Sequence, residues 1–123
     1  MAFTKSTTST ALAGTLIKIS SVTNSSEDNV TGAASGRVYQ IRVDNSLNSG
    51  VPAYVKIKDA SSATVGTDNP DFTFYVPGGS TLTYVINTGH PYAAGVCVWC
   101  TTAPETANAS APQNAVSATL LVS

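Results

Sequence analysis

The sequence predicts an all-β fold: a single-domain antiparallel β-sandwich, or a small barrel, of about seven strands. Between Val51 and Thr102, short runs of alternating apolar and polar residues follow one another, and a Gly, Pro, Asn or Asp turn ends each run. No stretch shows the helical period of apolar residues. At 123 residues the chain has the length of one domain. We expect the β-sandwich domain over residues 12–123, after a flexible N-terminal arm over residues 1–11.

Each predicted strand is recognised by the apolar residues that share one of its faces. In 37–44, for example, Tyr39, Ile41 and Val43 alternate with polar residues. The turn signal at 77–80, Pro-Gly-Gly-Ser, predicts that the strands on either side of it form a hairpin. The expected strands are 12–22, 37–44, 53–59, 72–76, 81–87, 93–101 and 116–122.

The strand expected at 93–101 is apolar on both of its faces. Cys97 and Trp99 occupy the face opposite Val96, Val98 and Cys100, whereas a sheet with one solvated side should alternate. The Cys97/Trp99 face therefore needs a cover, either a loop or arm of the same chain or a second subunit. Because Trp is enriched at interfaces, we predict an oligomer interface. Its residues are Cys97, Trp99, Tyr75 and Val85, the last two having outward parity in their predicted hairpin.

The spacing Cys97-x-x-Cys100 resembles a redox or zinc motif, but its setting does not suit either. No helix pattern follows to lower a thiol pKa. In a strand, residues three apart point to opposite faces with Cα atoms about 10 Å apart, and a disulfide needs less than about 7 Å. A zinc site needs four ligands, and His90 is the single histidine. We predict structural buried thiols, with no metal and no cofactor.

Other polar residues do not form a catalytic set. His90 lies in a predicted loop, and no motif frames a nucleophile for it to activate. Asp59, Asp68 and Asp71 flank the 60–70 connection, where carboxylates hold Ca²⁺ in some proteins but more commonly cap turns. The prediction is that the protein is not an enzyme.

The composition argues against charged partners. Only 11% of the residues are charged, and the net charge is −1. Nucleic-acid binding requires Lys and Arg to displace counterions, so we expect no nucleic-acid partner. No apolar segment approaches the ~20 residues of a membrane helix, so we expect no membrane partner. The N-terminal residues lack the apolar core of a secretory signal, which indicates folding in a cytoplasm.

Several short motifs carry a resemblance to a known class of proteins. They are VKIKDA at 55–60, VGTDNPD at 65–71 and VPGG at 76–79, followed by Gly95-Val96, Thr101-Thr102 and a valine-rich last strand. With them the chain, from Arg37 to Val122, resembles small β-sandwich virion proteins of tailed phages, of the capsid cement or decoration type.

The resemblance implies a protein on the capsid surface of a virion, assembled in the host cytoplasm. It implies the major capsid protein as partner and a homo-oligomer, with a trimer favoured. We expect the arm to contact the shell through Phe3 and Lys5. The alternatives are a tail, neck or fibre-associated virion protein, or a carbohydrate- or host-surface-binding β-sandwich module with Tyr92 and Trp99 as candidate aromatics.

Overall fold

The structure, a computed structural model, describes residues 14–32 and 35–123, which form seven strands and no helix. The prediction of an all-β fold is confirmed. The expected arm at 1–11, with Phe3 and Lys5, lies outside the described residues. The strands are β1 (Thr15–Ile19), β2 (Gly36–Asp44), β3 (Ala53–Asp59), β4 (Phe72–Val76), β5 (Thr81–Tyr92), β6 (Val96–Thr101) and β7 (Ser117–Val122).

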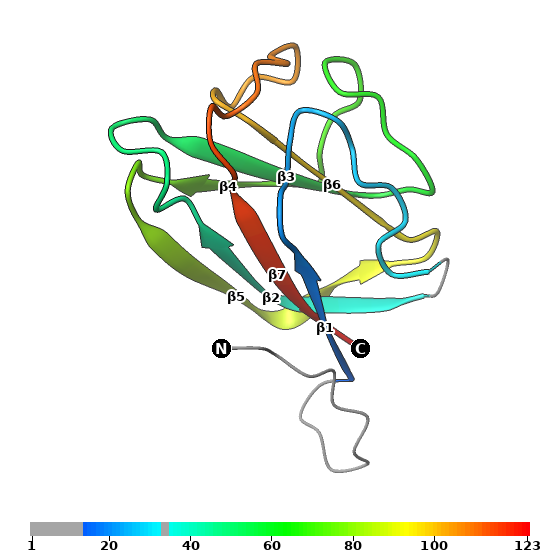
Figure 1. Cartoon of the computed structure of the whole chain (residues 1–123). Helices are drawn as coiled ribbons and strands as arrows, with labels where there is room; N and C mark the ends of the chain where they lie inside the picture. The colour runs from blue at the N-terminus through cyan, green and yellow to red at the C-terminus, as the bar shows by residue number, and fades with distance from the viewer. Residues whose placement is uncertain (1–13, 33–34) are drawn as a thin grey trace.

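The strands form two antiparallel sheets, which makes the fold a small β-sandwich. The four-stranded sheet has the order β1-β7-β2-β5, and the three-stranded sheet has the order β4-β3-β6. Figure 1 shows the four-stranded sheet as one layer, with β3, β4 and β6 in a second layer behind it. The apolar side chains that point inward from both sheets pack into one core, which includes Val38, Ile41, Val55, Val98 and Leu120.

The turn at 77–80 does not join two paired strands, so the predicted hairpin is wrong. β4 pairs with β3, and β5 pairs with β2, so the turn carries the chain from one sheet to the other. The rings of Phe74 and Tyr84 lie 5.3 Å apart between the two strands. The turn itself is present at 77–80, but a turn sequence alone does not determine which strand the following strand pairs with.

The fifth strand is longer than the sequence indicated. β5 continues through the expected loop at 88–92, so His90 lies in a strand opposite Val38. The pairing of β2 and β5 is irregular between Val38 and Gln40, where β5 contains extra residues. A bulge of this kind lets Gly89 and Pro91 be included in a strand, which the local sequence does not suggest.

One end of the sandwich is tied together around the 77–80 turn. Gly78 sits so close to Asn48 and Val51 that a Cβ atom at this position would collide with their backbone. Residue 78 must therefore be glycine for the turn to pack against the 45–52 loop. This contact places the turn between β4 and β5 beside the connection between β2 and β3.

Candidate functional site

The outer face of the three-stranded sheet is covered by loops of the same chain. Lys56 and Trp99, which pair across β3 and β6, are 0% and 1% exposed. The Nζ of Lys56 donates to the carbonyl of Glu105 at 2.9 Å, which places the 102–110 loop over this face. Burial lowers the pKa of Lys56, and the negative charge of Glu105 opposes this effect.

Two further loops complete the cover. The 20–32 loop pairs with the outer edge of β6, where the backbone N–H of Glu27 donates to the carbonyl of Val98 at 2.8 Å. The Nδ2 of Asn24 then donates to the carbonyl of Ala109 at 2.8 Å. The 60–71 loop joins them through a hydrogen bond from Thr106 to Asn69 at 2.8 Å.

This cover corrects the predicted oligomer interface. Cys97 and Trp99 lie beneath the chain's own loops and are not accessible to a second subunit. Tyr75 and Val85 do reach the surface, at 46% and 67% exposure. Tyr75 lies on the same outer face of the three-stranded sheet as Trp99, whereas Val85 lies on the outer face of the four-stranded sheet, so the four residues do not form one face. The apolar second face of β6 reflects burial on both sides of the strand.

The two cysteines occupy opposite sides of β6, as their spacing predicted. Cys100 belongs to the core between the sheets, whereas the thiol of Cys97 donates to the carbonyl of Ala60 at 3.1 Å under the loops. Both are buried free thiols. Burial raises the pKa of Cys97 and raises that of Cys100 to about 12. Neither thiol is therefore activated as a nucleophile.

The strands β4 and β5 carry four of the six large apolar side chains that are exposed in the described chain. We call residues 72–89 the open edge, because β4 and β5 are the outermost strands of their sheets. Four large apolar side chains are exposed on it: Phe72, Tyr75, Leu82 and Val85. The open edge contains no Asp, Glu, Lys, Arg or His.

A group of polar side chains adjoins the open edge near Phe72. The Nε2 of His90 lies 3.3 Å from the Oδ2 of Asp71, and the same oxygen accepts the backbone N–H of Asp59 at 2.7 Å. The Oδ1 of Asp59 accepts the backbone N–H groups of Ala93 and Ala94. Both carboxylates therefore cap backbone groups, which is the common use of Asp in turns.

The outer face of the four-stranded sheet differs from that of the other sheet, because its side chains are half-buried or exposed. The strand registers place Lys18, Thr119, Arg42 and Thr83 in one row across it. Lys18 and Arg42 are exposed. The adjacent row consists of Leu16, Leu121, Gln40 and Val85.

Cations and acids are divided between the two sides of the sandwich. Among the described residues, the strands of the four-stranded sheet contain one acid, Asp44. They also contain Lys18, Arg37 and Arg42. The three-stranded sheet carries Lys56 and Lys58. With its covering loops it also holds the other acids of the described chain: Glu27, Asp28, Asp59, Asp68, Asp71 and Glu105. One side is therefore net positive and the other net negative.

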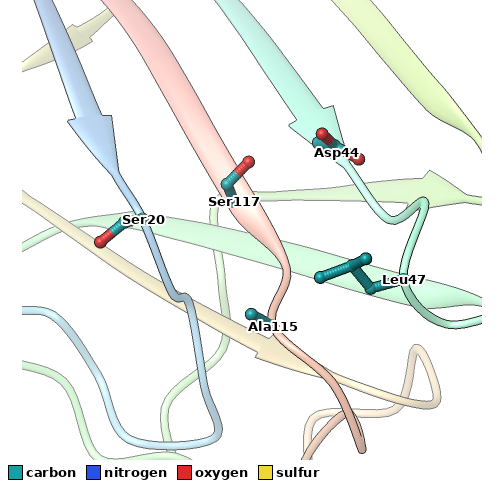
Figure 2. A pocket seen from close by; sticks show the side chains of 5 residues that line it. All are labelled: Ser20, Asp44, Leu47, Ala115 and Ser117. Atoms are coloured by element: carbon teal, nitrogen blue, oxygen red, sulfur yellow. The ribbon is translucent and has the colours of Figure 1, made fainter. Parts of the chain in front are cut away.

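A shallow hollow lies at one end of the four-stranded sheet. Figure 2 shows the residues that line it, Ser20, Asp44, Leu47, Ala115 and Ser117. The volume of the hollow is about 160 Å³. The Oδ1 of Asp44 accepts the backbone N–H of Ser46 at 2.9 Å and the hydroxyl of Thr81 at 3.2 Å. The hydrogen bond of the Ser46 side chain lowers the pKa of Asp44 most, and the bonds from the Ser46 backbone and from Thr81 lower it further. The lining of the hollow contains no histidine or cysteine.

The described part of the chain contains no cluster of three His, Cys, Asp or Glu side chains placed to hold a metal ion. It also contains no helix that could span a membrane. Comparison of the chain with protein-family models, with curated proteins and with solved structures gives no match. The surfaces described above are therefore the basis for a functional proposal.

Proposed function

We propose that this protein is a viral structural protein, a capsid decoration or cement protein that binds the outer surface of a phage capsid. Its partner is the major capsid protein, and it acts as a homo-oligomer on the virion, assembled in the host cytoplasm. The motifs at 55–60, 65–71 and 76–79 support this through their resemblance to such proteins.

The observation that carries the proposal is the presence of two separate uncovered surfaces on one small domain. The outer face of the four-stranded sheet presents Lys18 and Arg42, and β4, at the edge of the other sheet, presents Phe72 and Tyr75. A cement protein needs one surface for the shell and another for its neighbours. Its task is then to stabilise contacts between capsomers.

Such a protein requires only modest affinity at each contact. When several copies are linked, each further contact forms within the assembly, and the total strength exceeds that of one contact. We assign the shell contact to the face that carries Lys18 and Arg42, because opposite charge on a partner orients the approach. The arm residues Phe3 and Lys5 remain predicted shell contacts.

A carbohydrate-binding module is the second candidate, and one observation favours it. The exposed ring of Tyr75 lies 5.4 Å from the ring of Tyr54, which offers a small aromatic surface to a sugar. The aromatics that the sequence offers for this role, Tyr92 and Trp99, are 4% and 1% exposed and do not present such a surface. A location in the tail, neck or fibre is the other alternative.

The experiment that tests the function is quantitative mass spectrometry of purified particles from the source, with the major shell protein as internal standard. A copy number of the same order as the shell subunit is expected. A much lower number moves the protein to the tail, neck or fibre. Absence from particles contradicts the virion proposal, and binding to a glycan array then tests the carbohydrate alternative.

The shell-facing surface has its own test. Particles that lack the protein are incubated with the wild type, with Lys18→Glu/Arg42→Glu, and with Lys58→Glu as a control on the opposite sheet. The double variant should bind at least tenfold more weakly, and wild-type binding should weaken as salt is raised. Equal binding by all three proteins overturns the assignment of this face.

A further inference from the structure

We infer that the shallow hollow beside Asp44 receives a lysine side chain of the partner protein. The inference rests on the proposed function in one respect, because the hollow lies on the face that we assign to the shell. It adds the chemical group that the partner must supply at this place, a primary ammonium on an aliphatic stem.

The hollow lies at one end of the outer face of the four-stranded sheet. The strand registers place Asp44 between Ser117 on β7 and Thr81 on β5. This row is two residues along each strand from the row of Arg42, so both rows point to the same side of the sheet. A partner that contacts Arg42 therefore also reaches the hollow.

The polar side chains that line the hollow are all hydrogen-bond acceptors. Asp44 supplies a carboxylate. Ser20 and Ser117 supply hydroxyls that have no hydrogen-bond partner among the described residues. The described lining contains no Lys, Arg or His that could occupy the acceptors. One negative charge between two hydroxyls is complementary to a cationic donor.

The hydrogen bonds of Asp44 favour lysine over arginine. Its Oδ1 already accepts the backbone N–H of Ser46 and the hydroxyl of Thr81. An arginine binds a carboxylate best through two parallel N–H groups, which need both oxygens. An ammonium is instead a point charge with three donors, which suits one carboxylate oxygen and two hydroxyls.

The rest of the lining is apolar and suits the stem of a lysine. Leu47 and Ala115 line the hollow together with the polar residues, as Figure 2 shows. Leu47 is 63% exposed. A lysine lays its four-carbon stem along apolar surface of this kind while its amine keeps polar partners. A bare metal ion or a free ammonium ion would make no use of Leu47.

The neighbouring cations indicate that the lysine belongs to a protein segment that also carries an acid. Lys18 and Arg42 occupy the next row and would repel an isolated amine. In an extended segment, residues two apart point to the same side at a separation of about 7 Å. Asp44 and Arg42 have the same spacing along β2, so a Lys-x-Glu segment matches both charges.

The peptide acetyl-Lys-Ala-Glu-amide tests the hollow without any particle. Its binding is followed by the backbone amide NMR shifts of the isotope-labelled chain. We expect saturable shifts at Leu47 and Ser117, with a Kd on the order of 1–10 mM. The same peptide with an acetylated lysine amine keeps the stem and lacks the charge, and it should bind about tenfold more weakly.

Two variants assign this binding to the carboxylate. Asp44→Asn should raise the Kd about tenfold. Glu27→Gln removes an exposed acid on the opposite side of the sandwich and should leave the Kd unchanged. Circular dichroism checks that both variants are folded. If Asp44→Asn is not, Leu47→Ser takes its place and should raise the Kd about threefold through the lost stem contact.

Particles that lack the protein show whether the shell supplies the lysine. Acetylation of their surface amines should weaken wild-type binding more than reductive methylation, which keeps the charge. Asp44→Asn should be less sensitive to this difference than the wild type.

Four results overturn the inference. They are the absence of shifts at Leu47 and Ser117 up to about 50 mM peptide, equal binding of the charged and the acetylated peptide, equal affinity of the wild type and Asp44→Asn, and equal binding to acetylated and methylated particles. The peptide results do not bear on the particle copy number, so the hollow and the capsid proposal can fail separately.

Discussion

The Nδ2 of Asn48 donates to the Oδ1 of Asn45 at 2.9 Å, and both side chains are buried. The Nδ2 of Asn45 in turn donates to the carbonyl of Val51 at 3.0 Å and to that of Val76 at 3.3 Å. Asn48 also bonds both backbone groups of Asn114. The pair therefore holds together the ends of strands from both sheets.

Replacing Asn45 by alanine should destabilise the fold. The substitution removes the side-chain donor to the buried carbonyl of Val76 and the acceptor of one N–H of the Asn48 amide, and each unsatisfied buried group costs about 1–3 kcal/mol. Urea denaturation at pH 7 should show a loss of about 2–4 kcal/mol. Ser49→Ala, at an exposed position in the same loop, is the control. Equal stability of the two variants contradicts the role assigned to Asn45.

Replacing Lys56 by methionine should stabilise the fold at pH 7. Burial lowers the pKa of Lys56, so the cost of keeping the buried amine charged is present at neutral pH and is relieved as pH rises through the lowered pKa toward 10.5. Methionine keeps the apolar stem, and we expect a gain of about 1 kcal/mol in the free energy of unfolding. Urea denaturation measures it, with Lys58→Met as control. A loss above about 2 kcal/mol would mean that the bond to Glu105 outweighs desolvation.

Alkaline pH should destabilise the protein through Cys100. Burial raises the pKa of its thiol from 9.0 to about 12, so its contribution is fully present below pH 9 and is lost as pH rises toward 12. Between pH 9 and 12 the Cys100 thiol should therefore lower the free energy of unfolding by up to about 1.4 kcal/mol per pH unit. Urea denaturation at pH 8–11 under reducing conditions measures the slope. Cys100→Ala should give a shallower slope, and parallel slopes would sink this explanation.

Acid should weaken the hydrogen bonds by which Asp59, at the end of β3, holds the turn before β6. The pKa of Asp59 is lowered, chiefly by the hydrogen bond from the backbone N–H of Ala94. Its contribution is therefore present above pH 3.8 and is lost as pH falls through the lowered value. Urea midpoints between pH 2 and 6 should fall less steeply for Asp59→Asn than for the wild type. Glu27→Gln, at an exposed side chain, should follow the wild type.

The positions of the strands were largely predictable from the sequence. The positions of the candidate functional surfaces were not. The alternation of Ala53, Val55 and Ile57 with longer polar and aromatic residues indicates the position of β3, because successive side chains of a strand point to opposite faces. Trp99 was placed correctly on the second face of β6. Its cover was not predictable, because the 102–110 loop reaches it only through contacts such as that between Lys56 and Glu105, far apart in sequence.

By itself, the sequence determined the all-β class, the approximate strands, the opposite faces of Cys97 and Cys100, and the lack of charge along 72–89. These are local properties, which depend on side-chain period and on residue type. The tertiary structure alone decided that β4 and β5 belong to different sheets, that Trp99 is covered by its own chain, and that cations and acids separate. The physical reason is that backbone hydrogen bonds are alike in every strand. Pairing therefore depends on which apolar faces pack together across the whole chain.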